Sequence, residues 1–210
     1  MPKLSDAEAS RLLAKHGLSV PKHKVVKTEK QALDFARKVG YPVVLKVSSK
    51  QVVHKIDVGG VAFADNMEEL KKGFRQVYGS VKKVKGAKLD GVLVQKKVEG
   101  IEVIIGGKQD SQFGPVIMFG LGGIFVEALK DVVFRLVPIT RQDAEQMLVE
   151  IKGRAVLEGL RGKRIDREAL VDALLKASRL MEREGLAEMD LNPVMAGPKQ
   201  AWVADARFVK

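Results

Sequence analysis

Cysteine is absent from the 210 residues of the chain. Disulfide bonds and zinc sites built on cysteine are therefore excluded, and we expect a cytoplasmic location. No apolar run approaches the roughly 20 residues that a membrane-spanning helix needs, and residues 1–10 lack the apolar core of a secretory signal. With 46% hydrophobic and 30% charged residues, the composition predicts a soluble globular protein with no membrane segment.

Aromatic residues make up only 5% of the chain, although its formal net charge is +11. A basic surface can attract nucleic acid, acidic membranes or phosphorylated small molecules. A stacking platform for single-stranded nucleic acid needs aromatic side chains, which this chain supplies poorly. The lysines are also dispersed, with their densest cluster at residues 81–88. We therefore keep a basic nucleic-acid-binding module only as an alternative.

The order of helices and strands predicts an α/β or α+β fold. Helices are expected where a capping residue precedes apolar residues at helical spacing, and strands where apolar residues run between glycine or proline signals. Two neighbouring strands, residues 91–98 and 101–106, are expected to pair antiparallel, as is the closing pair, which argues against an all-parallel sheet. The expected helices cover residues 5–17, 28–40, 66–83, a segment from 140, and 167–184; the expected strands cover residues 43–47, 61–64, 91–98, 101–106, 116–119, 132–137, 186–194 and 201–208.

We expect the hinge of the chain at Glu99-Gly100. We expect two lobes, residues 1–98 and 99–210. Neither an internal repeat nor a long linker suggests any further division.

Lys46 lies inside the apolar run Val43–Val47. A charged lysine is rarely buried without a partner. Its ammonium group could meet a nucleotide phosphate as a point charge. Equally, its aliphatic stem could cover apolar surface while the charged end stays in water. The spacing alone leaves both interpretations open.

His54 is followed by Lys55, by Asp57 and by the pair Gly59-Gly60. A neutral imidazole can attack a phosphoryl group while a neighbouring cation screens the incoming charge. The glycines would allow backbone to approach a ligand closely. The alternative is an ordinary histidine in a surface turn, and His16 and His23 are assigned to that ordinary class.

Two further segments carry oxygen or backbone groups suited to a phosphate ligand. Residues 120–123 (GLGG) can present N–H groups to an anion, although they match neither a P-loop nor a dinucleotide-binding fingerprint. Glu188, Asp190 and Asn192 would share one face of a strand, and Asp205 on the closing strand would join them. Such oxygen ligands can hold a Mg²⁺ ion that also bridges phosphates. A polar strand end with a turn is the alternative.

Taken together, these segments resemble the ATP-grasp subunit of ADP-forming acetyl-CoA synthetases. Residues 43–60 (VVLKVSSKQVVHKIDVGG) resemble the family's lysine strand and histidine loop, and residues 112–131 (QFGPVIMFGLGGIFVEALKD) its glycine-rich signature. Residues 188–193 with 205–207 resemble the metal-binding end shared with succinyl-CoA synthetase. The resemblance spans essentially the whole chain and implies an ATP-grasp fold of two α/β lobes, with nucleotide in the cleft between them.

The resemblance also implies how ATP or ADP and Mg²⁺ are bound. Lys46 would contact the nucleotide phosphates, and a hinge containing Gln95, Lys96 and Val98 would cover the adenine, mainly through backbone. The family often has an acidic residue after the glutamine, where this chain has Lys96, so the preference for ATP or GTP stays open. Beside the nucleotide would lie Glu102 and Asp190, and the metal ligands would be Asn192 and Asp205.

In the family, acyl-CoA, ADP and phosphate are converted reversibly into free acid, CoA and ATP. The resemblance implies that His54 relays the phosphoryl group, with Lys55 steadying its charge and Asp57 orienting the imidazole. It also implies a CoA-binding α subunit that carries a second phosphohistidine, in a heteromer with two copies of each subunit.

Two further alternatives remain beside this interpretation. A different ATP-grasp ligase, which activates a carboxylate as an acyl phosphate, would not need His54. A regulatory subunit would bind ATP without any chemistry.

Overall fold

The computed structural model describes residues 3–52, 55–81, 84–123, 131–159 and 164–210. The chain forms two compact units. One contains Met1–Leu4, Glu8–Val20 and Val98–Lys210, and the other contains Ser5–Ala7 and Pro21–Lys97. The chain passes from one unit to the other at Lys97 and Val98, next to the expected hinge. Residues 8–20, however, belong to the larger unit and not to a lobe of residues 1–98, because Ala9, Leu12 and Leu13 are part of its core.

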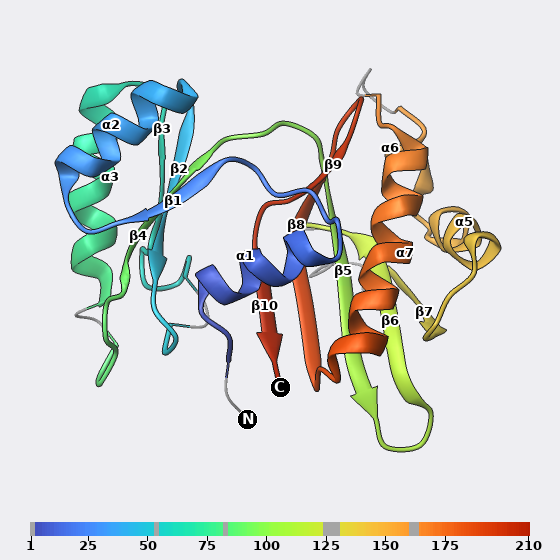
Figure 1. The fold of residues 1–210 in the computed structure, drawn as a ribbon. Coiled ribbons are helices and arrows are strands. Elements are labelled where there is room, and N and C mark those ends of the chain that lie inside the picture. Colours follow the sequence, from blue (N-terminus) through green and yellow to red (C-terminus); the bar gives the residue numbers. More distant parts are fainter. Residues whose placement is uncertain (1–2, 53–54, 82–83, 124–130, 160–163) are drawn as a thin grey trace. The chain divides into compact units, whose positions relative to one another are not determined.

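The smaller unit is a four-stranded antiparallel sheet covered by two helices (Figure 1). Its strands lie in the order β1-β4-β2-β3, and every ladder between them is antiparallel. Alternate residues of β2 and β4, such as Leu45 and Val94, pack with helical residues such as Leu70 in one core. The elements are β1 (His23–Val26), α2 (Glu29–Val39), β2 (Val43–Ser48), β3 (Val61–Ala64), α3 (Met67–Ser80) and β4 (Gly91–Lys96).

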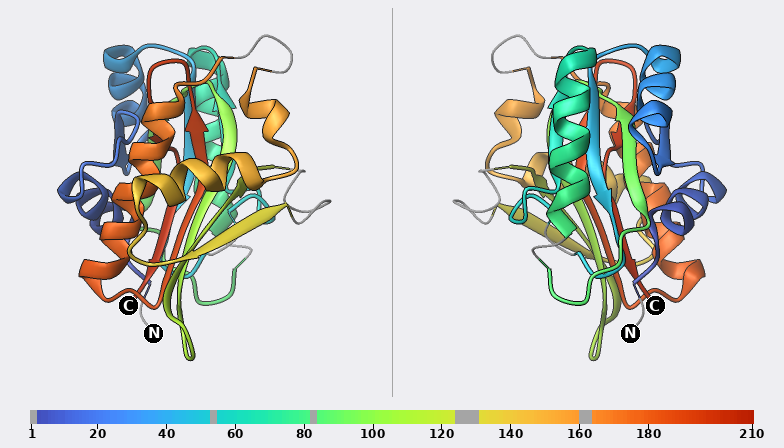
Figure 2. Two further views of the ribbon diagram at one scale, coloured as in Figure 1. Left: turned by 90° about the vertical axis from the view of Figure 1, so that its right-hand side faces the viewer. Right: turned by 90° about the vertical axis from the view of Figure 1, so that its left-hand side faces the viewer.

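The larger unit is built on a six-stranded sheet whose ladders are also antiparallel. The strand order is β10-β8-β5-β6-β7, with β9 paired to β8. The helices α5 and α7 lie on the same face of this sheet (Figure 2). The elements are α1 (Asp6–Lys15, in this unit from Glu8), β5 (Ile101–Asp110), β6 (Gly114–Leu121), β7 (Val132–Leu136), α5 (Arg141–Glu150), α6 (Arg154–Leu157), α7 (Arg167–Glu184), β8 (Glu188–Ala196), β9 (Ala201–Val203) and β10 (Ala206–Val209).

One predicted strand pair is wrong. Residues 91–98 and 101–106 were expected to pair, but β4 pairs with β1 and β2, whereas β5 pairs with β6 and β8. Gly100 explains the difference, because a Cβ atom there would lie 2.7 Å from the carbonyl oxygen of Ala196. The glycine allows close packing on β8 and does not form a hairpin turn.

Local signals predicted the helices well. Thr28, Asn66 and Thr140 each accept a hydrogen bond from a backbone N–H three residues later, as N-caps do. The helix expected over residues 66–83 ends at Ser80. Strand β1 and the short helix α6 were not predicted from the sequence.

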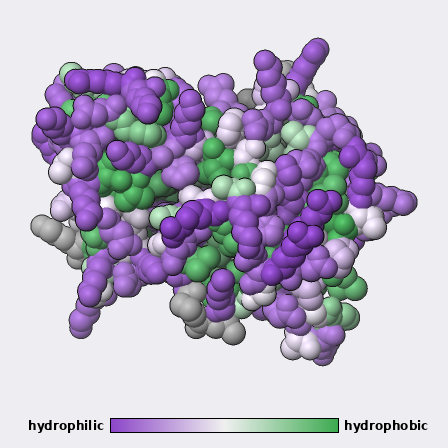
Figure 3. Space-filling view, in the orientation of Figure 1, coloured by the Kyte–Doolittle hydropathy of each residue, from purple (hydrophilic) through white to green (hydrophobic). Residues whose placement is uncertain are grey.

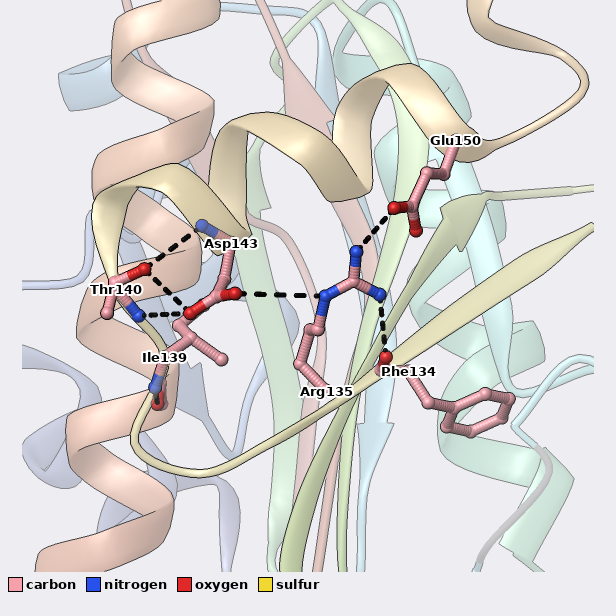
Figure 4. A network of polar contacts seen from close by, with 7 residues as sticks. Phe134, Arg135, Ile139, Thr140, Asp143 and Glu150 are labelled. Atoms are coloured by element: carbon pink, nitrogen blue, oxygen red, sulfur yellow. Dashed lines mark hydrogen bonds and ion pairs between the residues drawn. The ribbon is translucent and has the colours of Figure 1, made fainter.

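The edge strand β7 is fastened to α5 by a polar network (Figure 4). Arg135 lies 2.6 Å from Glu150 and 4.0 Å from Asp143, and Asp143 closes the capping box of Thr140. The Oγ atom of Ser178 on α7 accepts the N–H of Ile139 at 3.0 Å, which holds the β7–α5 connection against α7. Together these contacts fix the outer edge of the larger sheet.

Polar side chains cover most of the face seen in Figure 3, with smaller groups of hydrophobic residues between them. Within the described residues, no helix has both the length and the apolar character needed to cross a membrane.

The ends of α1 and α7 are joined by Glu184. Its Oε1 atom lies 2.7 Å from Nζ of Lys15 and 2.8 Å from Nε2 of His16. Hydrogen bonds from His16 and then Lys15 lower the pKa of Glu184 from 4.5 to about 2. A carboxylate whose pKa is lower in the folded state stabilises the fold above its unfolded pKa, and this stabilisation is lost as pH falls through the folded value.

We predict that Glu184→Gln lowers the free energy of unfolding at pH 7 by about 1–2 kcal/mol, as expected for hydrogen bonds to a charged group. The difference from wild type should shrink as pH falls from 5 towards 2, because the wild-type carboxylate becomes protonated. Urea unfolding across this pH range measures it, with the exposed Glu182→Gln on α7 as the control. A difference that is independent of pH would contradict the assigned cause.

Candidate functional site

Lys46 lies at the centre of the smaller sheet. All six residues of β2 are buried, and Lys46 is only 7% exposed. Its Nζ atom donates a hydrogen bond to Oε1 of Gln95 on β4 at 3.0 Å. The ammonium group is therefore held inside the unit and does not extend into water, which argues against the snorkelling interpretation.

The ladder between β2 and β4 explains why these two side chains meet. Val44 lies opposite Gln95, and Lys46 lies opposite Leu93, so all four residues share one face of the sheet. The other face carries Leu45 and its neighbours, which pack against the helices. The sheet thus presents one apolar face to α2 and α3, and on its second face it holds a lysine and an amide.

The hinge residues are tied to the start of β2 and to the chain before β1. The N–H groups of Lys96 and Lys97 donate to the carbonyl oxygens of Lys22 and Pro42, at 2.8 and 3.1 Å. The side chain of Lys96 donates to the carbonyl oxygens of Gly40 and Tyr41, at 3.1 and 2.7 Å. It therefore stabilises the end of α2.

This use of Lys96 explains how a lysine fits where the family often has an acid: the side chain is directed to backbone carbonyls. Val98, the last predicted hinge residue, is half-buried and belongs to the larger unit. Binding of adenine by Gln95, Lys96 and Val98 stays a prediction.

The loop between β2 and β3 contains the predicted relay residues. His54 lies outside the described residues. Lys55 is buried at 8% exposure, and its Nζ atom lies 3.3 Å from Oδ1 of Asp6. Its carbonyl oxygen accepts the N–H of Gly60 at 2.7 Å. Lys55 thus acts as an anchor of the loop, whereas Asp57 is exposed, and the catalytic roles predicted for these residues remain predictions.

Glu102 and the glycine-rich segment come together in the larger unit. Gly122 donates its N–H to the carbonyl oxygen of Glu102 at 2.7 Å. A Cβ atom on Gly123 would lie 3.2 Å from Oε2 of Glu102, and Gly123 has a φ of +62°. The segment differs from the expected turn at its start, because Gly120 and Leu121 still belong to β6. Two predicted features that are far apart in sequence are therefore adjacent.

The backbones of the predicted metal ligands Asn192 and Asp205 meet at the middle of β8. Glu188, Asp190 and Asn192 alternate with the buried Met189 and Leu191, which confirms that they share the face away from the core. The N–H of Asn192 donates to the carbonyl oxygen of Asp205 at 3.2 Å.

The expected position of Asp205 on the closing strand is wrong, because Asp205 lies in the connection between β9 and β10. Strand β9 ends at Val203 and β10 begins at Ala206, and the backbone between them turns to meet Asn192 and Pro193. Among the described residues, no group of three or more His, Cys, Asp or Glu side chains could hold a metal ion. Asn192 and Asp205 would thus supply two oxygen ligands, and phosphate and water would have to supply the rest.

Sequence reasoning missed two features of these surroundings. The contact between Lys46 and Gln95 depends on strand register, which no local pattern reveals. Asp131 closes the glycine-rich signature and is a buried carboxylate, only 6% exposed. The position of this charged residue directly before an apolar strand could have drawn attention to Asp131.

Comparison with known proteins gives a consistent result. The ATP-grasp domain family matches residues 2–209. The chain is 43% identical over 211 residues to the β subunit of acetate–CoA ligase [ADP-forming] I from Pyrococcus furiosus, covering 98% of this chain and 91% of that subunit. It is 47% identical over 207 residues to acetate–CoA ligase [ADP-forming] II from Archaeoglobus fulgidus. The chain spans only 30% of that longer protein.

Solved structures of one archaeal enzyme share the fold. A dinucleotide-forming acetyl-coenzyme A synthetase 1 from Ca. Korarchaeum cryptofilum, in complex with coenzyme A, Ca-AMPCP and HgCl+, matches with a TM-score of 0.92 and 46% identity. The match covers 99% of this chain and 93% of that one. A Se-Met derivative of the same protein, with coenzyme A and Mg-AMPPCP and its phosphohistidine segment pointing towards the nucleotide-binding site, matches with a TM-score of 0.83 and 42% identity, covering 99% and 92%.

The antiparallel sheets, their helical layers and these matches agree with the fold expected from the sequence. The chain has the ATP-grasp fold, and it belongs to the family of ADP-forming acetate–CoA ligase β subunits.

Proposed function

We propose that this chain is the nucleotide-binding β subunit of an ADP-forming acyl-CoA ligase. It would carry out Mg²⁺-dependent phosphoryl transfer between ADP or ATP and a histidine, as one part of a reversible conversion of acyl-CoA, ADP and phosphate into free acid, CoA and ATP. The observation that carries the proposal is the match to separate β subunits over nearly their full length, 91% and 89%.

Each compact unit carries groups that would contact the nucleotide. On the smaller unit, Lys46 would bind phosphate oxygens, and the hinge residues Gln95, Lys96 and Val98 would receive the adenine. Because the N–H groups of Lys96 and Lys97 already donate within the protein, the hinge would use carbonyl oxygens and the N–H of Val98. On the larger unit, Glu102 and Asp190 would lie beside the nucleotide.

Mg²⁺ would be bound by Asn192 and Asp205. Their backbones are joined by a hydrogen bond at the middle of β8, so the strand would support a metal held by both side chains. Mg²⁺ usually takes one or two protein ligands together with substrate phosphates and water, which fits a pair of oxygen ligands. The ion would neutralise charge that develops on the transferred phosphoryl group.

His54 would accept the phosphoryl group and pass it on. Attack by the imidazole nitrogen on the γ-phosphorus of ATP forms a P–N bond as the P–O bond to ADP breaks; the reverse step returns the group to ADP. Lys55, which is anchored to Asp6, would hold the adjacent His54 in place and stabilise the negative charge of the phosphoryl group. Asp57 would orient the imidazole.

A CoA-binding α subunit with a second phosphohistidine would complete the enzyme, in a heteromer of two copies of each subunit. The Archaeoglobus relative is a single chain more than three times as long as the matched region, whereas the Pyrococcus relative is a β subunit. The CoA-binding α subunit would select the acyl group. A relative 41% identical over 203 residues is named for 4-hydroxybutyrate, which supports a shared nucleotide part and a variable acid. The cytoplasmic location expected from the composition stays a prediction.

We predict that Asp205→Asn raises the Mg²⁺ concentration needed for half-maximal ADP binding by about tenfold, because a neutral amide is a weaker ligand than a carboxylate. Calorimetric titrations with ADP at several Mg²⁺ concentrations would measure the change. Asp172→Asn on the exposed surface of α7 is the matched control and should leave the requirement unaltered. Identical Mg²⁺ curves for wild type and Asp205→Asn would remove Asp205 from the metal site.

The test of the proposed reaction is phosphorylation of His54. Incubation of the chain with γ-labelled ATP and Mg²⁺ should give a label that is acid-labile and base-stable, as a phosphohistidine is. The label should be absent from His54→Ala and reduced or absent in His54→Asn. His16→Gln should keep the label, because His16 hydrogen-bonds to Glu184 in the larger unit.

A second measurement separates a relay from direct transfer. Reconstituted with its CoA-binding partner, His54→Ala should bind ADP nearly as wild type does but should lose the overall reaction. Turnover of this variant at close to the wild-type rate would show that the phosphoryl group passes directly between ADP and the partner's histidine.

A further inference from the structure

Asp131 is a buried carboxylate to which the proposed transfer chemistry assigns no role. Its Oδ1 atom accepts the N–H of Lys152 at 2.8 Å, and its Oδ2 atom accepts the N–H of Gly153 at 2.7 Å. A buried carboxylate is costly unless hydrogen bonds satisfy it, and hydrogen bonds from N–H groups to a charged oxygen are the stronger kind. Asp131 therefore holds the turn before α6 firmly in one place.

The same turn is packed tightly against the end of β6. A Cβ atom on Gly153 would lie 2.4 Å from Cδ1 of Leu121 and 3.3 Å from Oδ2 of Asp131. On the neighbouring position of β6, a Cβ atom on Gly120 would lie 2.6 Å from the carbonyl oxygen of Asp131. Because neither glycine leaves room for a Cβ atom, the end of β6 and the turn are closely packed, and we expect a shift of one to move the other.

Beyond Leu121 the backbone reaches Glu102. Leu121 lies opposite Val103 on β5, and Gly122 donates its N–H to the carbonyl oxygen of Glu102. A Cβ atom on Gly122 would lie 3.0 Å from the Cβ atom of Glu102. A continuous series of contacts therefore runs from the Asp131 carboxylate through Gly153 and Leu121 to Glu102.

We propose that Asp131 is a positioning residue of the nucleotide site. Its carboxylate fixes the turn at residues 151–153 against the end of β6, and this sets the positions of Gly122, Gly123 and Glu102 relative to ADP or ATP. The inference rests on the proposed function, in which Glu102 and the glycine-rich segment contact the nucleotide. Asp131 would affect nucleotide binding without touching the nucleotide, through the residues that it positions.

A carboxylate that only supports folding predicts a different result. Loss of such a group lowers stability but leaves the affinity of the folded protein for nucleotide unchanged. Asp110 provides a matched control, because its Oδ1 atom accepts the N–H groups of Gln112 and Phe113, at 2.8 and 3.0 Å, in the turn between β5 and β6. It has the same two-donor chemistry as Asp131 and lies at the other end of β5 from Glu102.

The experiment compares ADP binding by wild type, Asp131→Asn and Asp110→Asn in the presence of Mg²⁺. Calorimetry is carried out at a temperature where circular dichroism shows each protein fully folded. We expect Asp131→Asn to bind ADP at least about tenfold more weakly, since small misplacements of positioning groups cost one or more orders of magnitude. Asp110→Asn should bind within about twofold of wild type.

A second variant keeps the test valid if Asp131→Asn does not fold. Gly153→Ala retains the carboxylate but pushes Leu121, and it should weaken ADP binding in the same way. Wild-type ADP affinity in folded Asp131→Asn, or in folded Gly153→Ala where only that variant folds, would overturn the inference and leave the proposed function standing. Failure of the wild-type chain to bind ADP would instead contradict the proposed function itself.

Discussion

The hydrogen bond between Lys46 and Gln95 holds a buried charge at the centre of the smaller sheet. It places an ammonium group on a strand whose residues are all buried, at 3.0 Å from an amide oxygen on the next strand. The oxygen fixes the direction of the ammonium group, while the strand fixes its position. A charge held in this way is prepared for an anionic ligand, because little rearrangement is needed when the ligand binds.

The rest of the smaller unit supports this arrangement. The helices α2 and α3 cover one face of the sheet with apolar side chains, so the other face is available for Lys46 and Gln95. Lys96 closes the end of α2, and Lys55 with Gly60 secures the loop after β2. In the larger unit, the corresponding fixed elements are the middle of β8 with Asn192, and the glycine-rich end of β6 beside Glu102. Each predicted ligand-binding group therefore lies on or beside a strand.

Much of the fold could be predicted from the sequence because its signals are local. The caps at Thr28, Asn66 and Thr140 act within a few residues, and so does the alternation along β8. The errors came from contacts between distant segments. The strands on either side of Glu99-Gly100 join different sheets, and the packing of Gly100 on Ala196 that decides this is invisible in a local pattern.

In the candidate site, too, local signals could be recognised in the sequence, whereas contacts between distant segments could not. Lys46 was predicted because a charged residue in an apolar strand is conspicuous, and Asn192 because it alternates with apolar residues along its strand. Glu102 was predicted from the family resemblance alone. Their neighbours could not be found in that way. Gln95 meets Lys46 only through strand register, Asp131 meets Gly153 only through a turn, and Lys55 proved to contact Asp6, 49 residues away.

The affinity of Lys46→Met for ADP shows whether the Lys46 ammonium group binds the nucleotide phosphates. Methionine keeps much of the stem and removes the charge, so binding of ADP with Mg²⁺, measured by calorimetry on the folded variant, should weaken by roughly ten- to a hundredfold, the strength of one charge-assisted contact. Lys24→Met, an exposed lysine on the same sheet, should bind ADP as wild type does. Unchanged ADP affinity in Lys46→Met would show that Lys46 does not bind the nucleotide.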